Sequence, residues 1–385
     1  MKERAINPYA LWLSSIRGVG NHTIKTLLET ASCAEEVYHM TDDEINKCLD
    51  GKLKRRGDAA GKALSICFAQ KMDPVEEAEK LRQRGIGFVS IEEDFFPQRL
   101  RGIPDCPYGI YFVRELVPDD VPSVAIVGAR NCSSYGREQA RVFAEKLALN
   151  GISVVSGMAR GVDGIAGRAA ANAGGRSYAV LGCGVDVVYP EENGELYDIL
   201  KERGGLISEY PPGTKPQTKL FPRRNRLISG LADLVLVIES RRRSGTVITV
   251  DSALEQGRDI FALPGRVSDA LSDGCNFLIS QGAGIACTPE TVIEHFYGVS
   301  ENGTDMFEQK RKERNLRRED LSGMEKVLFD VLGCGEIMEP DFLIGRMESI
   351  LGKHVDMEEF MACMTGLQMK GLAAEVGSCH YKGIG

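Results

Sequence analysis

Long hydrophobic segments are absent from this chain of 385 residues. No uninterrupted apolar run approaches the ~18 residues that a membrane-spanning helix needs. The segment up to Arg17 carries charge, but it has no apolar stretch long enough for a secretory signal. We therefore expect a cytoplasmic protein with neither a signal peptide nor a membrane span.

Histidine is scarce, with five in the chain and none between His39 and His295. No Ser–His or Cys–His pair can therefore form within the central part of the sequence, and the five histidines are too dispersed for a metal site. The eleven cysteines are scattered and include no C-x-x-C pair, which is typical of reduced thiols in a cytoplasmic protein. The sequence predicts no metal site, no cofactor and no catalytic residues, and hence a binding protein rather than an enzyme.

Positive charge is also in short supply, because the chain carries a net charge of −8. Taken alone, that value argues against a nucleic-acid partner. The charge is uneven, however: Val121–Glu290 has 19 Lys and Arg against 18 Asp and Glu, so this segment is +1 and the rest is −9. An acidic protein can still bind a polyanion if its arginines converge on one groove.

From Val121 onward, short apolar runs alternate with helical patterns. Leu234–Ile238 is apolar throughout and too short for a helix that stands alone, which is typical of a strand buried on both faces. We expect further strands at 124–127, 152–155, 177–181, 206–208 and 259–262, and helices at 137–150, 162–173, 194–203 and 247–256. Such alternation predicts an α/β fold, with a parallel sheet covered by helices on both faces as in Rossmann-like domains.

The N-terminal part is expected to form a small helical domain over residues 1–75. Gly18-Val19-Gly20 before a helical pattern resembles a helix-hairpin-helix (SAM-like) turn that can face a phosphate, although an ordinary structural turn explains it equally simply. Residues 76–298 should form an extended Rossmann-like domain. It begins with a helix at 75–84 and strands at 87–91 and 109–113, with an extended, proline-containing connection over 95–112.

The C-terminal part begins with a polar linker at 299–320, whose basic run is more typical of a solvated tether than of a binding site. Residues 321–385 then show three helical patterns, at 324–332, 341–351 and 357–370, followed by strands at 371–376 and at the end of the chain. This order predicts a winged-helix-like module. Its acidic composition favours a protein contact or a structural role over DNA.

The first strand–helix loop, Gly128–Gly136, lacks the G-x-G-x-x-G spacing of dinucleotide-binding folds. Ser156 stands at the end of the next strand, where such folds place an acidic residue for the ribose, so a dinucleotide cofactor is disfavoured. Arg130 instead brings a permanent charge suited to phosphate. The alternative is that Arg130 pairs with a local carboxylate.

The next two loops are rich in small residues. Ser156 and Gly157 allow backbone amides to approach an anion, and Arg160 adds charge. Asp163 and Asp186 are most simply interpreted as helix caps. Cys183 lies in the third loop, but no histidine is near it in sequence to activate the thiol.

The stretch around Phe221 combines an aromatic ring with several cations. Phe221 lies close to Lys219, Arg224 and Arg226, so it either stacks on a base while the charges take the backbone, or packs into the core. Arg224 and Arg226 are two positions apart, so on a regular helix they diverge by about 200°. Both can serve one ligand only if the helix start is irregular, or one of them braces the loop instead.

Ser244-Gly245-Thr246 opens the helix after the buried strand at 234–238 and follows the run Arg241–Arg243. Free amides and the positive end of a helix at this place form an anion cradle over the carboxyl end of the strand. With arginines on both flanks, the expected ligand is rich in phosphate.

These loops, in this order, resemble the DNA-processing protein A family (DprA, also called Smf). The resemblance rests on VAIVGARNCSSYG, SGMARGVDGIAGRAA, FPRRNRLISGL and SGTVIT and covers about residues 121–290. It implies a cytoplasmic protein that binds single-stranded DNA in an arginine-lined pocket, protects incoming DNA during natural transformation and helps to load the RecA recombinase. It also implies a homodimer formed through the same domain.

Carried onto matching positions, the resemblance assigns the DNA-binding residues Arg130, Ser156, Gly157, Arg160, Lys219, Phe221, Arg224, Asn225, Arg226, Ser244, Gly245 and Thr246. Two positions depart from the family pattern. Ala129 replaces a serine and still permits the tight turn, whereas Gly167 replaces a histidine and leaves the role of that histidine open.

A competing interpretation is an enzyme, a Rossmann-like nucleoside-monophosphate phosphoribohydrolase of the lysine-decarboxylase-like group. Such enzymes carry a PGG-x-GT-x-x-E phosphate loop. The comparable stretch here lacks the diglycine and the nearby glutamate, because Glu255 lies too far along the helix.

Overall fold

The structure is a computed structural model that describes residues 6–50, 52, 56–298, 321–332, 338–375 and 380–383. The chain divides into two compact units, 1–296 and 297–385. The predicted linker at 299–320 lies outside the described residues. The domain boundaries expected at 75 and 320 stay predictions.

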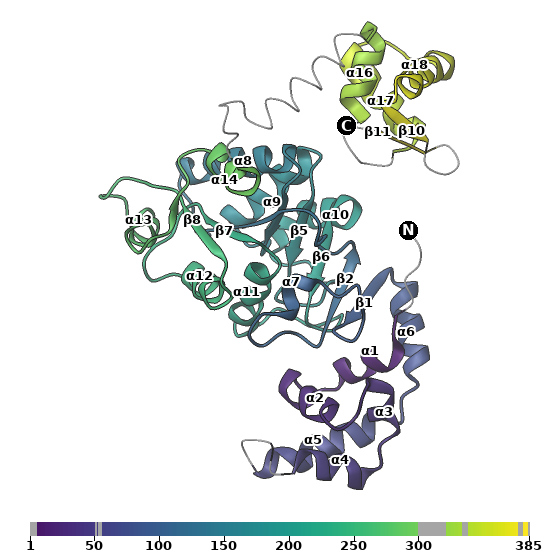
Figure 1. The fold of residues 1–385 in the computed structure, drawn as a ribbon, viewed down its shortest axis with the longest axis vertical. Coiled ribbons are helices and arrows are strands. Elements are labelled where there is room, and N and C mark those ends of the chain that lie inside the picture. The colour runs from purple at the N-terminus through teal and green to yellow at the C-terminus, as the bar shows by residue number, and fades with distance from the viewer. Residues whose placement is uncertain are drawn as a thin grey trace. The chain divides into compact units, whose positions relative to one another are not determined.

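A nine-stranded sheet forms the centre of the first unit, in the order β1-β2-β6-β5-β4-β3-β7-β8-β9 (Figure 1). Its strands are β1 (Ile86–Ser90), β2 (Gly109–Arg114), β3 (Ser123–Val127), β4 (Ser153–Ser156), β5 (Ser177–Val180), β6 (Gly205–Ser208), β7 (Leu234–Val237), β8 (Asp259–Ala262) and β9 (Gly284–Ile285). Strands β3 to β9 pair in parallel, and every residue of β3 to β7 is buried, as expected for strands covered on both faces. The predicted Rossmann-like fold is confirmed.

The hairpin β1–β2 departs from the parallel pattern, because β2 pairs antiparallel with both β1 and β6. The proline-containing segment between these strands was expected to be extended, but it includes the short helix α7 (Gln98–Arg101). Leu100 of α7 is fully buried, so packing against the sheet stabilises a helix too short to be recognised from its pattern.

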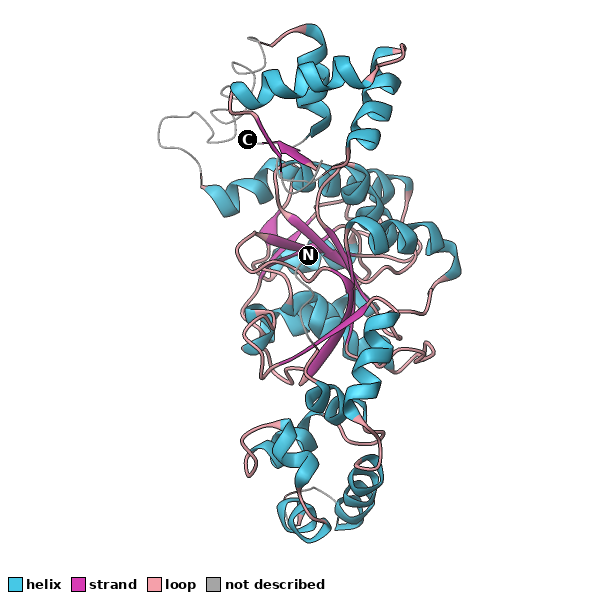
Figure 2. Ribbon diagram, turned by 90° about the vertical axis from the view of Figure 1, so that its right-hand side faces the viewer, coloured by secondary structure: helices cyan, strands magenta, loops and turns pink. Residues whose placement is uncertain are grey.

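Helices cover both faces of the sheet, as Figure 2 shows in cyan around the magenta strands. They are α8 (Ser134–Leu149), α9 (Val162–Asn172), the 3-10 turn η1 (Glu191–Asn193), α10 (Gly194–Arg203), α11 (Leu220–Gly230), α12 (Gly245–Glu255), α13 (Asp273–Ser280) and α14 (Pro289–Tyr297). Helices α8, α9 and α10 pack side by side, and α11 packs against α12 and α7. The sequence pattern had not indicated α13, α14 or β9.

The strand order reverses at β3. The chain steps outward from β3 through β4 and β5 to β6, then returns to place β7 on the other side of β3. In open parallel sheets, ligands bind beyond the carboxyl ends of the strands near such a reversal. The loops that follow β3, β4, β5 and β7 therefore meet at the expected position for a site.

The N-terminal helices gather beyond the β1 edge of the sheet (Figure 1). They are α1 (Pro8–Ser15), α2 (Asn21–Leu28), α3 (Ala34–His39), α4 (Asp42–Leu49), α5 (Arg56–Ala69) and α6 (Pro74–Gln83). Their buried side chains, such as Trp12 and Leu27, belong to one hydrophobic cluster with Phe88 of β1 and Tyr111 of β2. This core is therefore continuous with one face of the sheet.

The second unit contains α16 (Gly323–Leu332), α17 (Pro340–Leu351), α18 (Met357–Met369) and the antiparallel strands β10 (Ala373–Glu375) and β11 (Tyr381–Gly383). Three helices followed by a two-stranded sheet are the elements expected of a winged-helix-like module; residue 376, the predicted end of the first strand, lies outside the described residues. Leu328, Met347, Phe360 and Met364 are fully buried in its own core. Across the described parts of both units, no helix is both long enough and apolar enough to span a membrane.

Candidate functional site

A cavity of about 220 Å³ opens at the carboxyl ends of β3, β4 and β5. The loops after these strands and the start of α11 form its walls. The lining residues are Arg130, Asn131, Gly157, Met158, Ala159, Arg160, Leu181, Gly182, Cys183, Tyr189, Pro190, Phe221 and Arg224. Five of the twelve residues predicted to bind DNA are therefore brought together: Arg130, Gly157, Arg160, Phe221 and Arg224.

The start of α8 beside this cavity is occupied by a carboxylate of the protein itself. Glu239, just beyond the end of β7, is buried and accepts hydrogen bonds from the Ser133 backbone N, at 2.9 Å, and from the Ser133 hydroxyl. Gly136 makes room for it, because a Cβ there would lie 2.2 Å from a Glu239 oxygen. A buried carboxylate at this helix start repels phosphate, so the place where dinucleotide-binding folds hold a pyrophosphate is already filled.

The loop after β4 is held by Asp163, which corrects the prediction of a simple helix cap. Gly161 is the N-cap of α9, whereas Asp163 lies in the first helical turn. Its buried carboxylate accepts a hydrogen bond from the Gly157 backbone N at 3.1 Å. The amides of this loop, which we expected to face an anion, are thus partly engaged inside the protein.

Asn193 fastens the same loop from the other side. Its Nδ2 donates to the carbonyl oxygens of Met158, at 3.0 Å, and Ala159, at 3.1 Å. Met158 has a backbone φ of 54°, an uncommon conformation for a residue with a side chain. The loop is therefore held in one shape by contacts on both sides.

Arg224 lies in the floor of the cavity and is only 3% exposed. Its Nη1 donates to the carbonyl oxygens of Gly157, at 2.8 Å, and Val180, so it braces the loops after β4 and β5. Burial lowers the pKa of Arg224 to about 10, and nearby Asp163 works against that shift. The guanidinium therefore remains a cation at neutral pH.

Burial also raises the pKa of the Asp163 carboxyl, while the Arg224 cation is the strongest influence opposing this rise. The two residues lie close together, since a Cβ on Gly157 would be 2.7 Å from an Asp163 oxygen and 2.8 Å from Arg224 Nη2. Arg224 and Asp163 thus form the buried polar centre of the cavity floor.

Arg226 points away from this cavity, as the expected divergence of the two arginines requires. Helix α11 is regular over Leu220–Gly230, so an irregular start does not bring them together. Arg226 Nη2 lies 2.7 Å from both carboxylate oxygens of Glu209, and its Nε is 3.4 Å from Asp105. Arg226 is engaged in a separate ion-pair network.

Two aromatic rings form one wall. Phe221 and Tyr189 have ring centroids 5.4 Å apart and planes inclined by 30°. The Phe221 ring is half-buried against Gly182, where a Cβ would approach it to 2.6 Å, and so it is not a core residue. The guanidinium carbon of Arg130 lies 6.0 Å from its centroid. This wall combines an exposed stacking surface with a cation.

Tyr189 was not among the predicted site residues, although it lines the cavity and is 42% exposed. The sequence could have indicated Tyr189, because it is an aromatic residue in a loop at the carboxyl end of a strand. Phe221 was predicted to stack on a base because it is an aromatic residue beside several cations. What the sequence did not show is that the two rings face each other.

The rim carries the remaining charges. Arg130 is exposed and forms no ion pair with any described residue, so the alternative of a local carboxylate partner is not observed. Arg160 pairs with Glu192 of η1, and both side chains are more than half exposed. An incoming anion can compete for Arg160 because such a pair is weakly held in water.

The other predicted site residues do not line the cavity. The Ser156 hydroxyl donates to Ile126 O at 2.9 Å and ties β4 to β3. Lys219 is exposed just before α11, and Asn225 Oδ1 accepts from Arg224 Nε at 3.2 Å. Ser244, Gly245 and Thr246 open α12, where the Ser244 hydroxyl lies 2.9 Å from that of Ser240.

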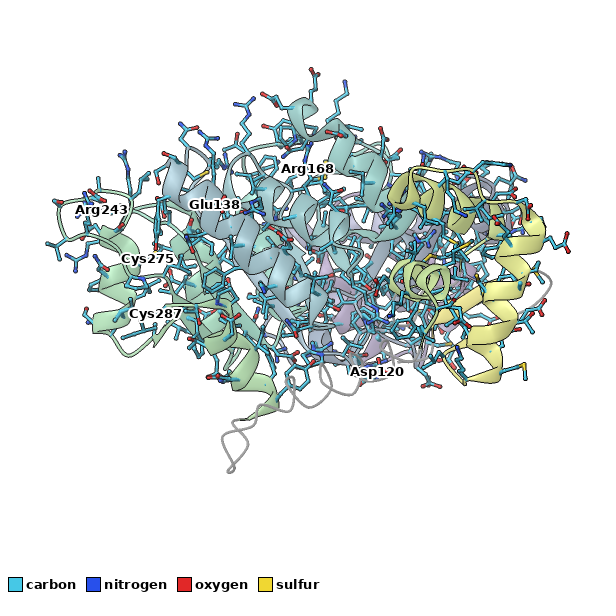
Figure 3. The ribbon with its side chains drawn as sticks, turned by 90° about the horizontal axis from the view of Figure 1, so that it is seen from above. Asp120, Glu138, Arg168, Arg243, Cys275 and Cys287 are labelled. Carbon is cyan, nitrogen blue, oxygen red and sulfur yellow. The ribbon has the colours of Figure 1, made fainter. Side chains whose placement is uncertain are left out.

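The arginine run before α12 also lies apart from the cavity. Arg242 has its guanidinium 4.0 Å from the centroid of Phe277. Seen from above, Arg243 lies at the outer edge of the molecule, well separated from Arg168 of α9 (Figure 3). None of Ser244, Gly245 and Thr246 lines the cavity, so the anion cradle expected there is not part of it.

The thiol in the cavity wall is a poor nucleophile. Cys183 is buried, and this burial raises its pKa to about 11, so it stays protonated at neutral pH. No group of three His, Cys, Asp or Glu residues in the described ranges is arranged to hold a metal ion. The chemistry that the cavity offers is the binding of an anion and of flat rings.

One protein family and several known proteins are similar to this chain in sequence. A profile of the family described as DNA recombination-mediator protein A matches residues 87–297. DNA processing protein DprA of Streptococcus pneumoniae is 41% identical over 279 residues, which cover 72% of this chain and 99% of that protein. Protein Smf of Escherichia coli K12 is 41% identical over 216 residues, 56% of this chain and 58% of Smf, so this match spans less than two thirds of Smf.

Two solved structures of DNA processing proteins have folds similar to that of this chain. The X-ray structure of DNA processing protein A from Streptococcus pneumoniae superposes with a TM-score of 0.63 at 34% identity, over 75% of this chain and 98% of that one. A structure of DNA processing protein A from Helicobacter pylori, described for its single-stranded DNA binding mode, has a TM-score of 0.50 at 29% identity. That match covers 54% of this chain and 95% of that one.

Proposed function

The chain belongs to the DNA recombination-mediator protein A family, and on that premise we propose that the cavity at the carboxyl ends of β3, β4 and β5 binds single-stranded DNA. The observation that carries this proposal is the pairing of an aromatic wall with converging arginines. Phe221 and Tyr189 offer rings on which bases stack, while Arg130, Arg160 and Arg224 supply positive charge for the backbone.

Single strands fit this arrangement better than duplex does. Stacking on a protein ring needs an exposed base face, which a paired base inside a duplex does not present. The cavity is built from loops and the start of α11, whereas a major-groove reader presents the exposed face of a helix or a β-ribbon. The Helicobacter pylori relative, described for its single-stranded DNA binding mode, supports the same interpretation.

Within the cell, we propose that the protein protects incoming single-stranded DNA during natural transformation and helps to load the RecA recombinase on it. A cytoplasmic location and a homodimer formed through the Rossmann-like unit belong to the same proposal. Their support is membership of the family and the likeness to the DNA processing proteins of Streptococcus pneumoniae. We further propose that the protein does no covalent chemistry on the DNA, since the cavity offers a protonated thiol and no histidine.

Fluorescence anisotropy with labelled oligonucleotides tests the central claim. We expect tighter binding to a single strand than to blunt duplex of equal length, and an affinity that falls as salt rises. The logarithm of the binding constant should drop by about 0.7 per decade of salt for each phosphate contacted. Equal affinity for the two forms would refute the proposal.

The same preparation separates this function from the phosphoribohydrolase alternative. Incubation with nucleoside monophosphates should release no free base, and labelled oligonucleotides should stay intact in the presence of divalent metal. Base release that co-purifies with the protein and is lost in Asp163→Asn would instead establish an enzyme.

A further inference from the structure

A second, larger cavity of about 410 Å³ lies where the β1–β2 hairpin joins the parallel sheet. Its walls come from the turn between α6 and β1, the end of β2, helix α10 and the loop after β5. The lining residues are Arg84, Gly85, Ile86, Val113, Arg114, Asp186, Tyr197 and Lys201. None of them belongs to the first cavity or was predicted to bind DNA.

Three of these side chains are cationic and one is a carboxylate. Asp186 is already engaged, since its carboxylate pairs with Arg84 Nη2 at 2.5 Å and accepts a hydrogen bond from the Gly213 backbone N at 2.7 Å. Asp186 is therefore not the helix cap that the sequence suggested. Arg114 and Lys201 are exposed and form no ion pair with any described residue. The cavity thus presents two unpartnered cations from different elements.

The backbone at Arg114 is unusual. This residue ends β2 with a φ of 70°, in the left-handed region that residues with side chains rarely adopt. Backbone strain of this kind is concentrated at functional positions. Here it accompanies an exposed guanidinium on the cavity wall.

The two cavities share one wall, the loop 181–190. Leu181, Gly182, Cys183, Tyr189 and Pro190 line the first cavity, and Asp186 lines the second. Cys183 and Asp186 are three positions apart, so their Cα atoms are at most ~11 Å apart. Val188 and Tyr189 of the same loop are 39% and 42% exposed. Both cavities therefore include residues of the same ten-residue loop.

We propose that the second cavity is a phosphate-binding site for the same DNA strand, with Arg114 and Lys201 as its ligands. The proposal rests on the proposed function and extends it from one cavity to a path across the loop 181–190. Ile86, Val113 and Tyr197 are buried in the cavity wall and hold the elements that carry the two cations. Only one carboxylate lies on the wall, and Arg84 neutralises it.

The test uses the full chain and two oligonucleotides, one just long enough for the first cavity and one several nucleotides longer. The variants are Arg114→Gly, Lys201→Ala and the double variant. Glycine suits position 114 because it adopts a φ of 70° without a Cβ penalty, so this variant should fold with an unchanged or higher Tm. Lys146→Ala, an exposed lysine on α8, is the matched control for a lost surface charge.

We expect the double variant to bind the longer strand several-fold more weakly than the wild type and the short strand equally well. The slope of its salt dependence on the longer strand should flatten by about 0.7 for each phosphate that the variant no longer binds. Lys146→Ala should change neither value. Unchanged binding of the longer strand by a folded double variant would overturn this proposal, and so would an equal weakening for both strands.

The design separates this proposal from the function on which it rests. If Arg130→Ala does not weaken binding of the short strand, then the first cavity is misassigned. If Arg130→Ala weakens it but the Arg114 and Lys201 variants leave the longer strand unaffected, only the second site is wrong. A mononucleotide whose binding the double variant abolishes, without any effect on the longer strand, would show a separate nucleotide site and would also overturn the proposal.

Discussion

Arg130, Arg224 and Arg226 were all predicted to bind DNA but have three different environments. Arg130 is exposed at the rim, Arg224 is buried beneath the loops after β4 and β5, and Arg226 pairs with Glu209 elsewhere. An exposed arginine can contribute most of its charge to a ligand, whereas a buried one also holds the protein together. The three should therefore respond differently to substitution.

Arg130→Ala should weaken single-strand binding by roughly 1–3 kcal/mol, the range for a charge-assisted contact. Because Arg130 has no ion pair among the described residues, the free energy of unfolding should hardly change. Anisotropy titration and urea denaturation measure the two quantities. Arg242→Ala, in the exposed run before α12, is the control and should cost much less binding. The reverse order of effects would move the site to Arg241–Arg243.

Arg224→Ala should lower both stability and binding. The carbonyl oxygens of Gly157 and Val180 would lose their donor, and Asp163 would lose its nearby positive charge. A buried polar group left without a partner costs about 1–3 kcal/mol. Urea denaturation followed by circular dichroism should show this loss, whereas an unaltered unfolding midpoint would mean that Arg224 does not brace the loops.

Glu192→Gln should strengthen single-strand binding by roughly two- to fivefold at low salt, because it releases Arg160 from an exposed ion pair of modest strength. The gain should shrink as salt rises, since exposed charges are screened. Titrations at two salt concentrations measure it. Weaker binding by this variant would indicate that the pair positions Arg160 rather than competing for it.

The element that dominates the site is the loop 181–190, which carries Tyr189 toward Phe221 of α11. The small residues at its start let the Phe221 ring lie directly on Gly182. Its far end leads into η1 and Asn193, which fastens the neighbouring loop after β4. A single connection thus shapes two walls of the cavity.

Tyr189→Ala should cost about 1–3 kcal/mol of single-strand affinity if a base stacks on this ring. The salt dependence of binding should stay the same, because a neutral ring releases no counterions. Tyr189→Phe, which keeps the ring, is the matched control and should bind like the wild type. Loss of affinity in both variants would assign the effect to the hydroxyl group instead of stacking.

At the scale of the whole first unit, Glu209 connects the N-terminal helices to α11. Its carboxylate accepts from Asn21 Nδ2 at 2.8 Å and pairs with Arg226 at 2.7 Å. Asn21 Oδ1 in turn accepts from the Tyr108 backbone N at 3.2 Å. The turn that was expected to face a phosphate is thus followed by a residue that fastens the helices to the sheet unit.

Glu209→Gln should lower the free energy of unfolding by about 1–3 kcal/mol, because the largely buried Arg226 would lose its bidentate carboxylate and keep only the longer contact with the exposed Asp105. Single-strand affinity of the folded fraction should stay close to that of the wild type, since neither residue lines the first cavity. Thermal unfolding and anisotropy test the two statements. A large loss of affinity with unchanged stability would place Arg226 in direct contact with DNA.

Removal of the second unit tests the independence of the two parts. Because residues 297–385 have their own core, a chain ending at 296 should fold and bind single strands with the affinity of the full chain. Circular dichroism and anisotropy check this outcome. Weaker binding by a folded fragment would show that the winged-helix-like unit contributes to the DNA interface.

Much of the fold could be read from the sequence because the signals are local. Strand β7 is an unbroken apolar run and β3 is apolar after its first residue, and a strand buried on both faces needs no other pattern. The absence of histidine between His39 and His295 by itself excluded a Ser–His or Cys–His pair in that stretch. The small residues of the crevice loops likewise indicated backbone that can approach a ligand.

Only the tertiary structure decided which of these groups meet. Glu239 occupies the start of α8, although more than a hundred residues separate it from Ser133. Tyr189 faces Phe221, and Arg224 turns inward while Arg226 turns to Glu209. The spacing of apolar residues in the sequence indicates which face of its helix or strand a residue occupies. It does not indicate which distant segment packs against that face in the folded chain. Five of the cavity residues were identified from the sequence, whereas Tyr189 and the contacts among all of them depended on the folded chain.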